Sequence, residues 1–202
     1  MMQSVDDEIL IAISKRGRGT VFFPNDFVSA GESKAVSKAL ERMANNGVIL
    51  RLAKGIYYYP KIDKVLGLGV LYPSFEEIAL SIAKRDRARI VPTGLYALNK
   101  LGLSTQVPMN IIYLTDGTPR KINLGNGRGI QFKRTIPKNL AFKNELSMLI
   151  TFALKEITPK RVTEEHLIRI KELLKNEPKI KIMADVKLMP VWIRSIITKA
   201  YE

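Results

Sequence analysis

Hydroxyl and cationic side chains alternate along residues 32–45, where the apolar residues follow a helical period. The apolar positions are i, i+3, i+4 and i+7, which line one face of a helix: Val36, Ala39, Leu40 and Met43. The opposite face would present short hydroxyls and cations: Ser33, Lys34, Ser37, Lys38 and Arg42. Lys and Arg neutralise phosphates, and short hydroxyls reach phosphate oxygens or base edges. The pattern therefore predicts a helix that contacts nucleic acid.

A short hairpin is predicted directly after this helix. Gly47 would end the helix, because Gly adopts the left-handed conformation that a C-terminal cap needs. Residues 48–52 and 56–59 then have the composition of two short strands. We expect Arg51 and Lys54, which lie on this hairpin, to contact phosphate.

One aromatic residue of the second strand joins the predicted DNA contacts. Tyr57 begins a run of three tyrosines and could stack on a base. The competing interpretation is that alternate strand positions of this run pack in the core.

Catalytic chemistry has few residues to build on. The chain contains no Cys and one His, His166, so hydrolase triads and zinc sites are not expected. The fragment Asp185-Val186-Lys187 has a nuclease-like Asp-x-Lys spacing, but such tripeptides also arise by chance. We therefore expect a protein that is not an enzyme, with no catalytic residue, no metal and no cofactor.

The residues before the nucleic-acid helix complete a compact unit. Residues 6–15 have a helical pattern, residues 20–23 a strand pattern, and residues 24–28 that of a short helix beginning at a proline. Helix, strand, short helix, tight turn, helix and hairpin is the order of a winged helix-turn-helix. The sequence predicts this fold for residues 1–60.

Two stretches resemble the AbiEi-type antitoxins of type IV toxin–antitoxin systems. The first contains residues 36–40 followed by Arg42, Gly47, Ile49, Arg51, Lys54, Gly55 and Tyr57. The second contains residues 93–98, residues 101–108, residues 113–117 and Arg120. The resemblance covers roughly residues 5–140, and the last third of the chain is less distinctive.

The resemblance implies a transcriptional autoregulator with two functions. Its winged helix would bind double-stranded operator DNA and repress the toxin–antitoxin operon, and its C-terminal domain would counteract a nucleotidyltransferase-like toxin. A direct complex with the toxin is not required in that family. The oligomeric state is left open, between a monomer that binds DNA cooperatively and a dimer.

The rest of the chain predicts a linker and a second domain. Residues 61–72 contain two glycines and are expected to form a linker. Residues 73–202 are expected to form a mixed α+β domain with a small antiparallel sheet and C-terminal helices. Its strands are predicted at 110–115, 121–124 and 130–134, and its helices at 74–84, 93–101, 144–156, 163–175 and 190–201. The predicted fold class of the whole chain is α+β.

Charge is concentrated in the second domain. The 202-residue chain has a net charge of +14, and residues 1–60 contribute eight cations against six acids. Residues 84–134 hold ten cations and two acids, which suggests a surface that meets a polyanion or the toxin pathway. The predicted antitoxin surface is Arg85, Arg87, Arg89, Arg120, Lys121, Arg128, Lys133 and Arg134.

Apolar runs are too short for a membrane span, and acids stand at the N-terminus where a signal peptide would carry cations. We therefore expect a cytoplasmic protein with no membrane partner. Two other functions remain open: a plain winged-helix repressor whose C-terminal domain dimerises or senses a ligand, and an RNA-binding protein that uses the basic 84–134 face.

Overall fold

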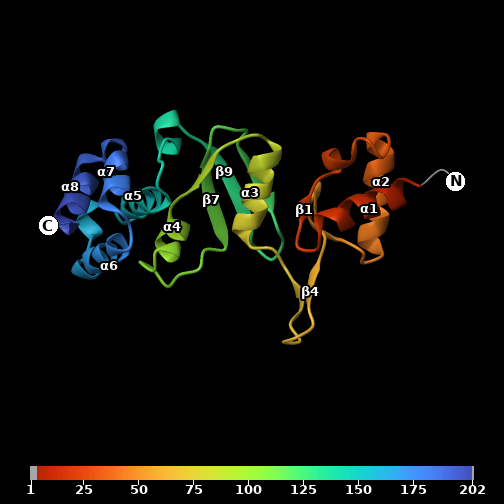
Figure 1. Ribbon diagram of the computed structural model, residues 1–202, viewed down its shortest axis with the longest axis horizontal. Coiled ribbons are helices and arrows are strands. Elements are labelled where there is room, and N and C mark those ends of the chain that lie inside the picture. The colour runs from red at the N-terminus through yellow and green to blue at the C-terminus, as the bar shows by residue number, and fades with distance from the viewer. Residues whose placement is uncertain (1–3, 202) are drawn as a thin grey trace. The chain divides into compact units, whose positions relative to one another are not determined.

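The computed structural model describes residues 4–201, which form eight α-helices and three small sheets (Figure 1). Residues 1–3 and 202, at the ends of the two predicted domains, lie outside the described residues. The chain divides into two compact units, Met1–Ile82 and Ala83–Glu202, here called unit 1 and unit 2. The fold is mixed α+β, as the sequence predicts.

Two helices and a 3-10 turn build the core of unit 1. Helix α1 (Val5–Arg16) begins at a capping box formed by Ser4 and Asp7. The 3-10 turn η1 (Pro24–Phe27) leads to helix α2 (Ser33–Asn45), whose apolar face is buried as predicted. The Gly47 amide bonds back to the Ala44 carbonyl, so α2 ends where the sequence indicates.

A three-stranded antiparallel sheet completes the core of unit 1. Its order is β1 (Val21–Phe22), β3 (Ile56–Tyr58) and β2 (Leu50–Ala53). Strands β2 and β3 form the predicted hairpin, and Gly55 in its turn has a positive φ of 71°. Phe22 packs edge-on against Phe27 with ring centroids 5.5 Å apart, which joins the sheet to η1.

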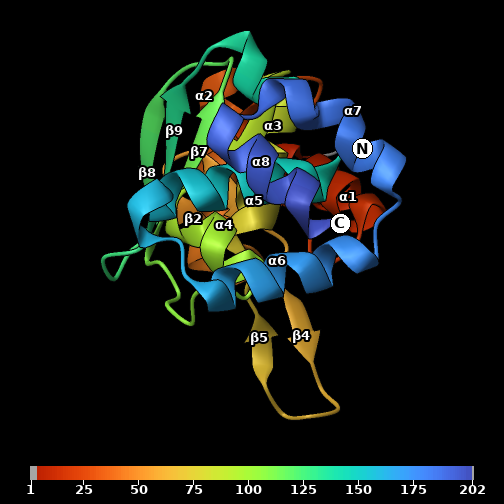
Figure 2. The same cartoon turned by 90° about the vertical axis from the view of Figure 1, so that its left-hand side faces the viewer.

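The predicted linker is instead a β-hairpin. Strands β4 (Lys61–Asp63) and β5 (Gly69–Leu71) pair antiparallel, and Figure 2 shows them side by side, joined at the bottom of the view by an extended loop. The Asp63 carboxylate accepts hydrogen bonds from the amides of Val65 and Leu66, which orders the turn. The two glycines of residues 61–72 belong to the turn and the second strand of a hairpin, and not to an irregular linker.

A hydrogen bond holds the base of this hairpin, and apolar side chains are exposed at its tip. The Tyr58 hydroxyl donates to the Leu71 carbonyl at 2.8 Å, and burial raises the pKa of Tyr58. At the tip, Val65 is 92% exposed and Leu66 76%. Helix α3 (Phe75–Arg85) follows, capped at its start by Ser74 and Glu77.

Unit 2 contains a four-stranded sheet in the order β6 (Ile90–Pro92), β7 (Asn110–Thr115), β9 (Gly129–Arg134) and β8 (Arg120–Asn123). Strands β8 and β9 form the predicted antiparallel hairpin. Strands β7 and β9 run parallel, so the prediction of an antiparallel sheet is wrong for this pair. After β7 the chain forms the edge strand β8 and then returns as β9 to a central position beside β7. Strands predicted one by one do not reveal this order.

Five helices form the second part of unit 2: α4 (Leu95–Lys100), α5 (Glu145–Ile157), α6 (Glu164–Lys175), α7 (Lys179–Asp185) and α8 (Val191–Ala200). Helix α5 lies at the centre of their apolar core. Helix α7 and strand β6 are absent from the sequence prediction; both are short.

Candidate nucleic-acid interface

The predicted nucleic-acid face of α2 is exposed. Burial of the apolar face against α1 and the sheet leaves Ser33, Lys34, Ser37, Lys38 and Arg42 on the solvent side. Within residues 4–201, Lys34 and Lys38 have no ion-pair or hydrogen-bond partner of their side chains. They therefore carry uncompensated charge on a helix of 13 residues.

Arg42 differs from the two lysines because it is tied to α1. Its Nε donates to Asp6 Oδ2 at 3.2 Å, and its Nη2 bonds the other carboxylate oxygen. This hydrogen bonding raises the pKa of Arg42 further. Arg42 is thus paired with an acid of α1, and its guanidinium helps to join the two helices.

Tyr57 is a core residue, so its prediction as a DNA contact is wrong. The side chain is 5% exposed and stacks on Phe22, with ring centroids 6.1 Å apart and planes at 16°. Strand β3 is the central strand of its sheet, and Tyr57 lies in the apolar core of unit 1. The competing interpretation, packing in the core, is correct for Tyr57, and the adjacent Tyr58 is buried as well.

The β2–β3 hairpin presents two further cations. Arg51 lies on β2 and Lys54 in the turn, and both are exposed. In the described part of the chain neither makes an ion pair. Unit 1 thus has free cations on two successive elements, α2 and the hairpin after it.

The arginines of unit 2 are partly neutralised. Arg85 donates to Asp86 at 2.8 Å, and Arg120 pairs with the same carboxylate from strand β8. Burial lowers the pKa of Arg120, and the nearby charge of Arg85 lowers it further. Arg120 also lies over the Phe132 ring. The shared carboxylate of Asp86 and the Phe132 ring thus hold Arg120 against the sheet.

Arg89 is paired in the same way. Its backbone amide and Nε both bond Asp116, at 2.7 and 2.9 Å, and these bonds lower the pKa of the carboxyl. The predicted cations without an ion pair among residues 4–201 are the remaining five: Arg87, Lys121, Arg128, Lys133 and Arg134.

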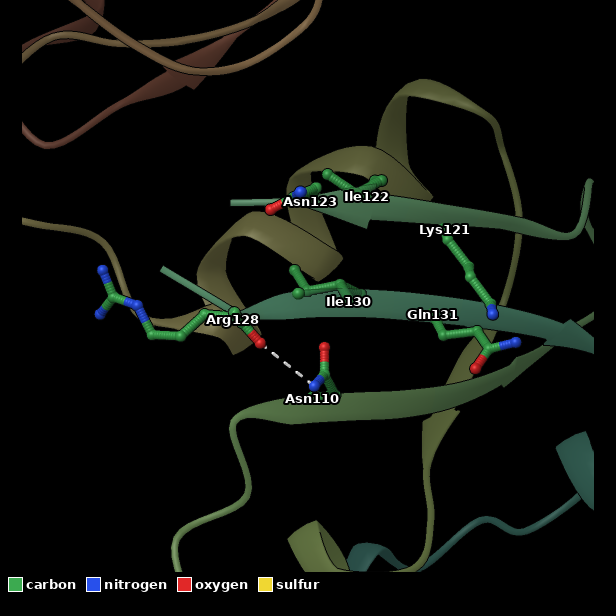
Figure 3. Close-up of a pocket in the computed structure, with 9 residues that line it drawn as sticks. Asn110, Lys121, Ile122, Asn123, Arg128, Ile130 and Gln131 are labelled. Atoms are coloured by element: carbon green, nitrogen blue, oxygen red, sulfur yellow. Dashed lines mark hydrogen bonds between the residues drawn. The ribbon is translucent and has the colours of Figure 1, made fainter. Parts of the chain in front are cut away.

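Two of these five line a hollow of about 380 Å³ beside strands β7, β8 and β9 (Figure 3). Lys121 and Arg128 share it with three amide side chains that sequence reasoning missed: Asn110, Asn123 and Gln131. No local motif marks these amides, because they come from three different strands. We call this hollow, with Lys121, Arg128 and the three amides, the sheet hollow.

His166 and Asp185, the residues weighed for catalysis, have structural partners. The His166 ring accepts the Thr163 amide at 3.1 Å and closes a capping box at the start of α6. Asp185 is 1% exposed and accepts the amides of Lys143 and Asn144 ahead of α5. Both arrangements satisfy helix-terminal groups.

Two features are absent from residues 4–201. No group of three or more His, Asp or Glu side chains lies close enough together to hold a metal ion. None of the helices in this range has the length and apolar character needed to cross a bilayer.

Comparison with known proteins gives a family without a known function. The crystal structure of RV2827C protein from Mycobacterium tuberculosis is similar, with a TM-score of 0.49 and 16% sequence identity, over 98% of this chain and 82% of that one. A comparison with curated proteins finds no match. Residues 8–182 match DUF6088, described as a family of unknown function. The chain belongs to this family, DUF6088.

Proposed function

We propose that unit 1 is a winged helix-turn-helix that binds double-stranded operator DNA. In this proposal α2 enters the major groove and the β2–β3 hairpin is the wing. The order α1, β1, η1, α2, β2, β3 supports it, with the single turn η1 in the place of the second helix. The observation that carries the proposal is that Lys34 and Lys38 on α2 are exposed and make no ion pair, as is also true of the cations on the hairpin that follows.

We further propose that the protein is an antitoxin and autoregulator of the AbiEi type. The two stretches of resemblance lie in different units, residues 36–57 in unit 1 and residues 93–120 in unit 2. That division supports two functions: repression by unit 1 and action against a nucleotidyltransferase-like toxin by unit 2. The free cations of unit 2 are the candidate surface for the second function.

Operator affinity tests the first half of the proposal. Lys38→Ala is expected to weaken binding to the DNA upstream of the gene by about 1–3 kcal/mol, roughly 5–150-fold, if Lys38 reads a base. Arg51→Ala is expected to reduce the slope of log affinity against log salt by about 1, because it neutralises one phosphate. Fluorescence anisotropy with a labelled duplex measures both quantities.

The matched control is Lys15→Ala, which removes one exposed cation from α1 of the same unit. It is expected to change the affinity little, because Lys15 lies on neither proposed contact element. Equal effects of all three substitutions would indicate a general charge effect and would contradict this placement of the DNA.

A further inference from the structure

The sheet hollow belongs to unit 2, and the duplex-binding function proposed for unit 1 does not involve it. Leu114 of β7 packs against the helical core, and the same sheet face continues on β9 and β8 with polar residues. On β9 this face carries Gln131 and Lys133, and on β8 it carries Lys121. The face therefore changes from apolar to polar across the sheet.

A glycine in the central strand opens the hollow. Gly129 lies between Asn123 on β8 and Asn110 on β7, directly opposite both. A Cβ atom at this position would lie 2.7 Å from the Ile122 carbonyl oxygen and 3.1 Å from Asn110 Oδ1. The close approach of the strands thus requires glycine. Of the three paired residues Asn110, Gly129 and Asn123, only the two asparagines carry side chains.

The amides are left with both donors and acceptors. Asn123 Oδ1 accepts the Gly125 amide at 2.8 Å, which leaves its NH₂ group free. Asn110 Nδ2 donates to the Gly127 carbonyl at 3.2 Å, which leaves its oxygen as an acceptor (Figure 3). The Gln131 amide, half-buried, has no partner among the described residues. A bare phosphate offers only acceptors and would leave the amide oxygens unpaired.

The cations stand at opposite ends of the hollow. Lys121 is opposite Gln131 across the β8–β9 pair, and Figure 3 shows Arg128 extending from the other end of the strand. The lining residues include no acid. A ligand that fits this arrangement has a planar centre with donors and acceptors and a negative charge on each side.

We propose that the sheet hollow binds an unpaired nucleotide of a single-stranded nucleic acid. The amides take the base edge, because Asn and Gln pair with the donor and acceptor of adenine in a bidentate way. Lys121 and Arg128 take the two flanking phosphates, and the guanidinium can also stack on a neighbouring base. This site is independent of the duplex-binding function proposed for unit 1.

Binding of a labelled eight-nucleotide oligoadenylate RNA, and of the DNA strand of the same sequence, tests the proposal. Fluorescence anisotropy is measured on the full chain with an excess of unlabelled duplex DNA, which occupies unit 1. Gln131→Leu and Arg128→Ser are each expected to weaken binding about fivefold or more. Preference for one of the two strands identifies the natural sugar.

Two matched variants control for composition and charge. Gln106→Leu removes an exposed amide and Arg161→Ser an exposed cation, both outside the hollow, and neither is expected to change the affinity as much. Arg128 lies in an exposed turn, so its variant decides the result if Gln131→Leu does not fold.

The contradicting results are equally specific. No saturable binding of either strand, or wild-type affinity in both hollow variants, would overturn the proposal. Competition by adenosine monophosphate as strong as by the strand would overturn the placement of a phosphate at each end. A failure of operator binding would leave these measurements unchanged, because the competitor duplex is present only to occupy unit 1.

Discussion

Replacement of Tyr57 by Ala is expected to destabilise unit 1 strongly and to weaken DNA binding. The side chain is 5% exposed and stacks on Phe22, so its removal leaves a cavity in the core. Large-to-small substitutions of buried aromatic residues cost about 3–5 kcal/mol. Folded domains have only about 5–15 kcal/mol in total, so the substitution removes a large fraction of the stability of unit 1.

The lone tryptophan separates the two units in this measurement. Trp192 packs against the core of unit 2, so its fluorescence reports the unfolding of that unit. We expect Tyr57→Ala to move the unfolding transition of unit 1, followed by circular dichroism, to lower denaturant concentration. The transition followed by tryptophan fluorescence should stay in place. Tyr72→Ala is the matched control: Tyr72 is 70% exposed, and the expected change is within about 0.5 kcal/mol. Equal stability of the two variants would contradict the core position of Tyr57.

Reversal of two free charges on unit 2 is expected to abolish rescue from the toxin while repression is kept. Lys133 and Arg134 are exposed and have no ion pair among the described residues, unlike Arg85, Arg89 and Arg120. The variant Lys133→Glu with Arg134→Glu therefore removes surface charge without breaking a bridge. Growth with co-expressed toxin and repression of a reporter measure the two functions in the same cells.

A second double variant controls for net charge. Lys171→Glu with Lys175→Glu makes the same charge change on exposed positions of α6, and rescue is expected to persist. If rescue and repression fall together in the Lys133 and Arg134 variant, unit 2 serves repression itself, as a dimerisation or ligand-sensing domain would.

The sequence predicts the elements of unit 1 well because their signals are local. The apolar residues of α2 recur at intervals of three and four residues, at Val36, Ala39, Leu40 and Met43, and Gly47 marks the end of the helix. The strand Asn110–Thr115 is also predicted from a local signal, a continuous apolar run, and the structure confirms it with residues that alternate in burial. The separation of an exposed cationic face from a buried one on α2 is confirmed.

Residue pairs that are distant in sequence could not be predicted. Arg42 and Asp6 are 36 residues apart and meet only because α1 and α2 pack together. The sheet hollow likewise depends on the parallel pairing of β7 and β9, which places Asn110 beside Gly129. The prediction for Tyr57 is wrong because β3 is buried on both faces, which the local sequence of a short strand does not reveal.

Position-directed DNA cleavage from α2 tests the central claim most directly. The chain has no cysteine, so Ser37→Cys gives a unique attachment point for an iron chelate on the exposed face of α2. With the upstream DNA of the gene, we expect cuts confined to short windows of the bound sequence, as a helix in the major groove requires. The same reagent on Ser195→Cys, exposed on α8, should give a different pattern or none. Diffuse cleavage from Ser37→Cys, or cuts identical to those from Ser195→Cys, would contradict the placement of α2 in the groove.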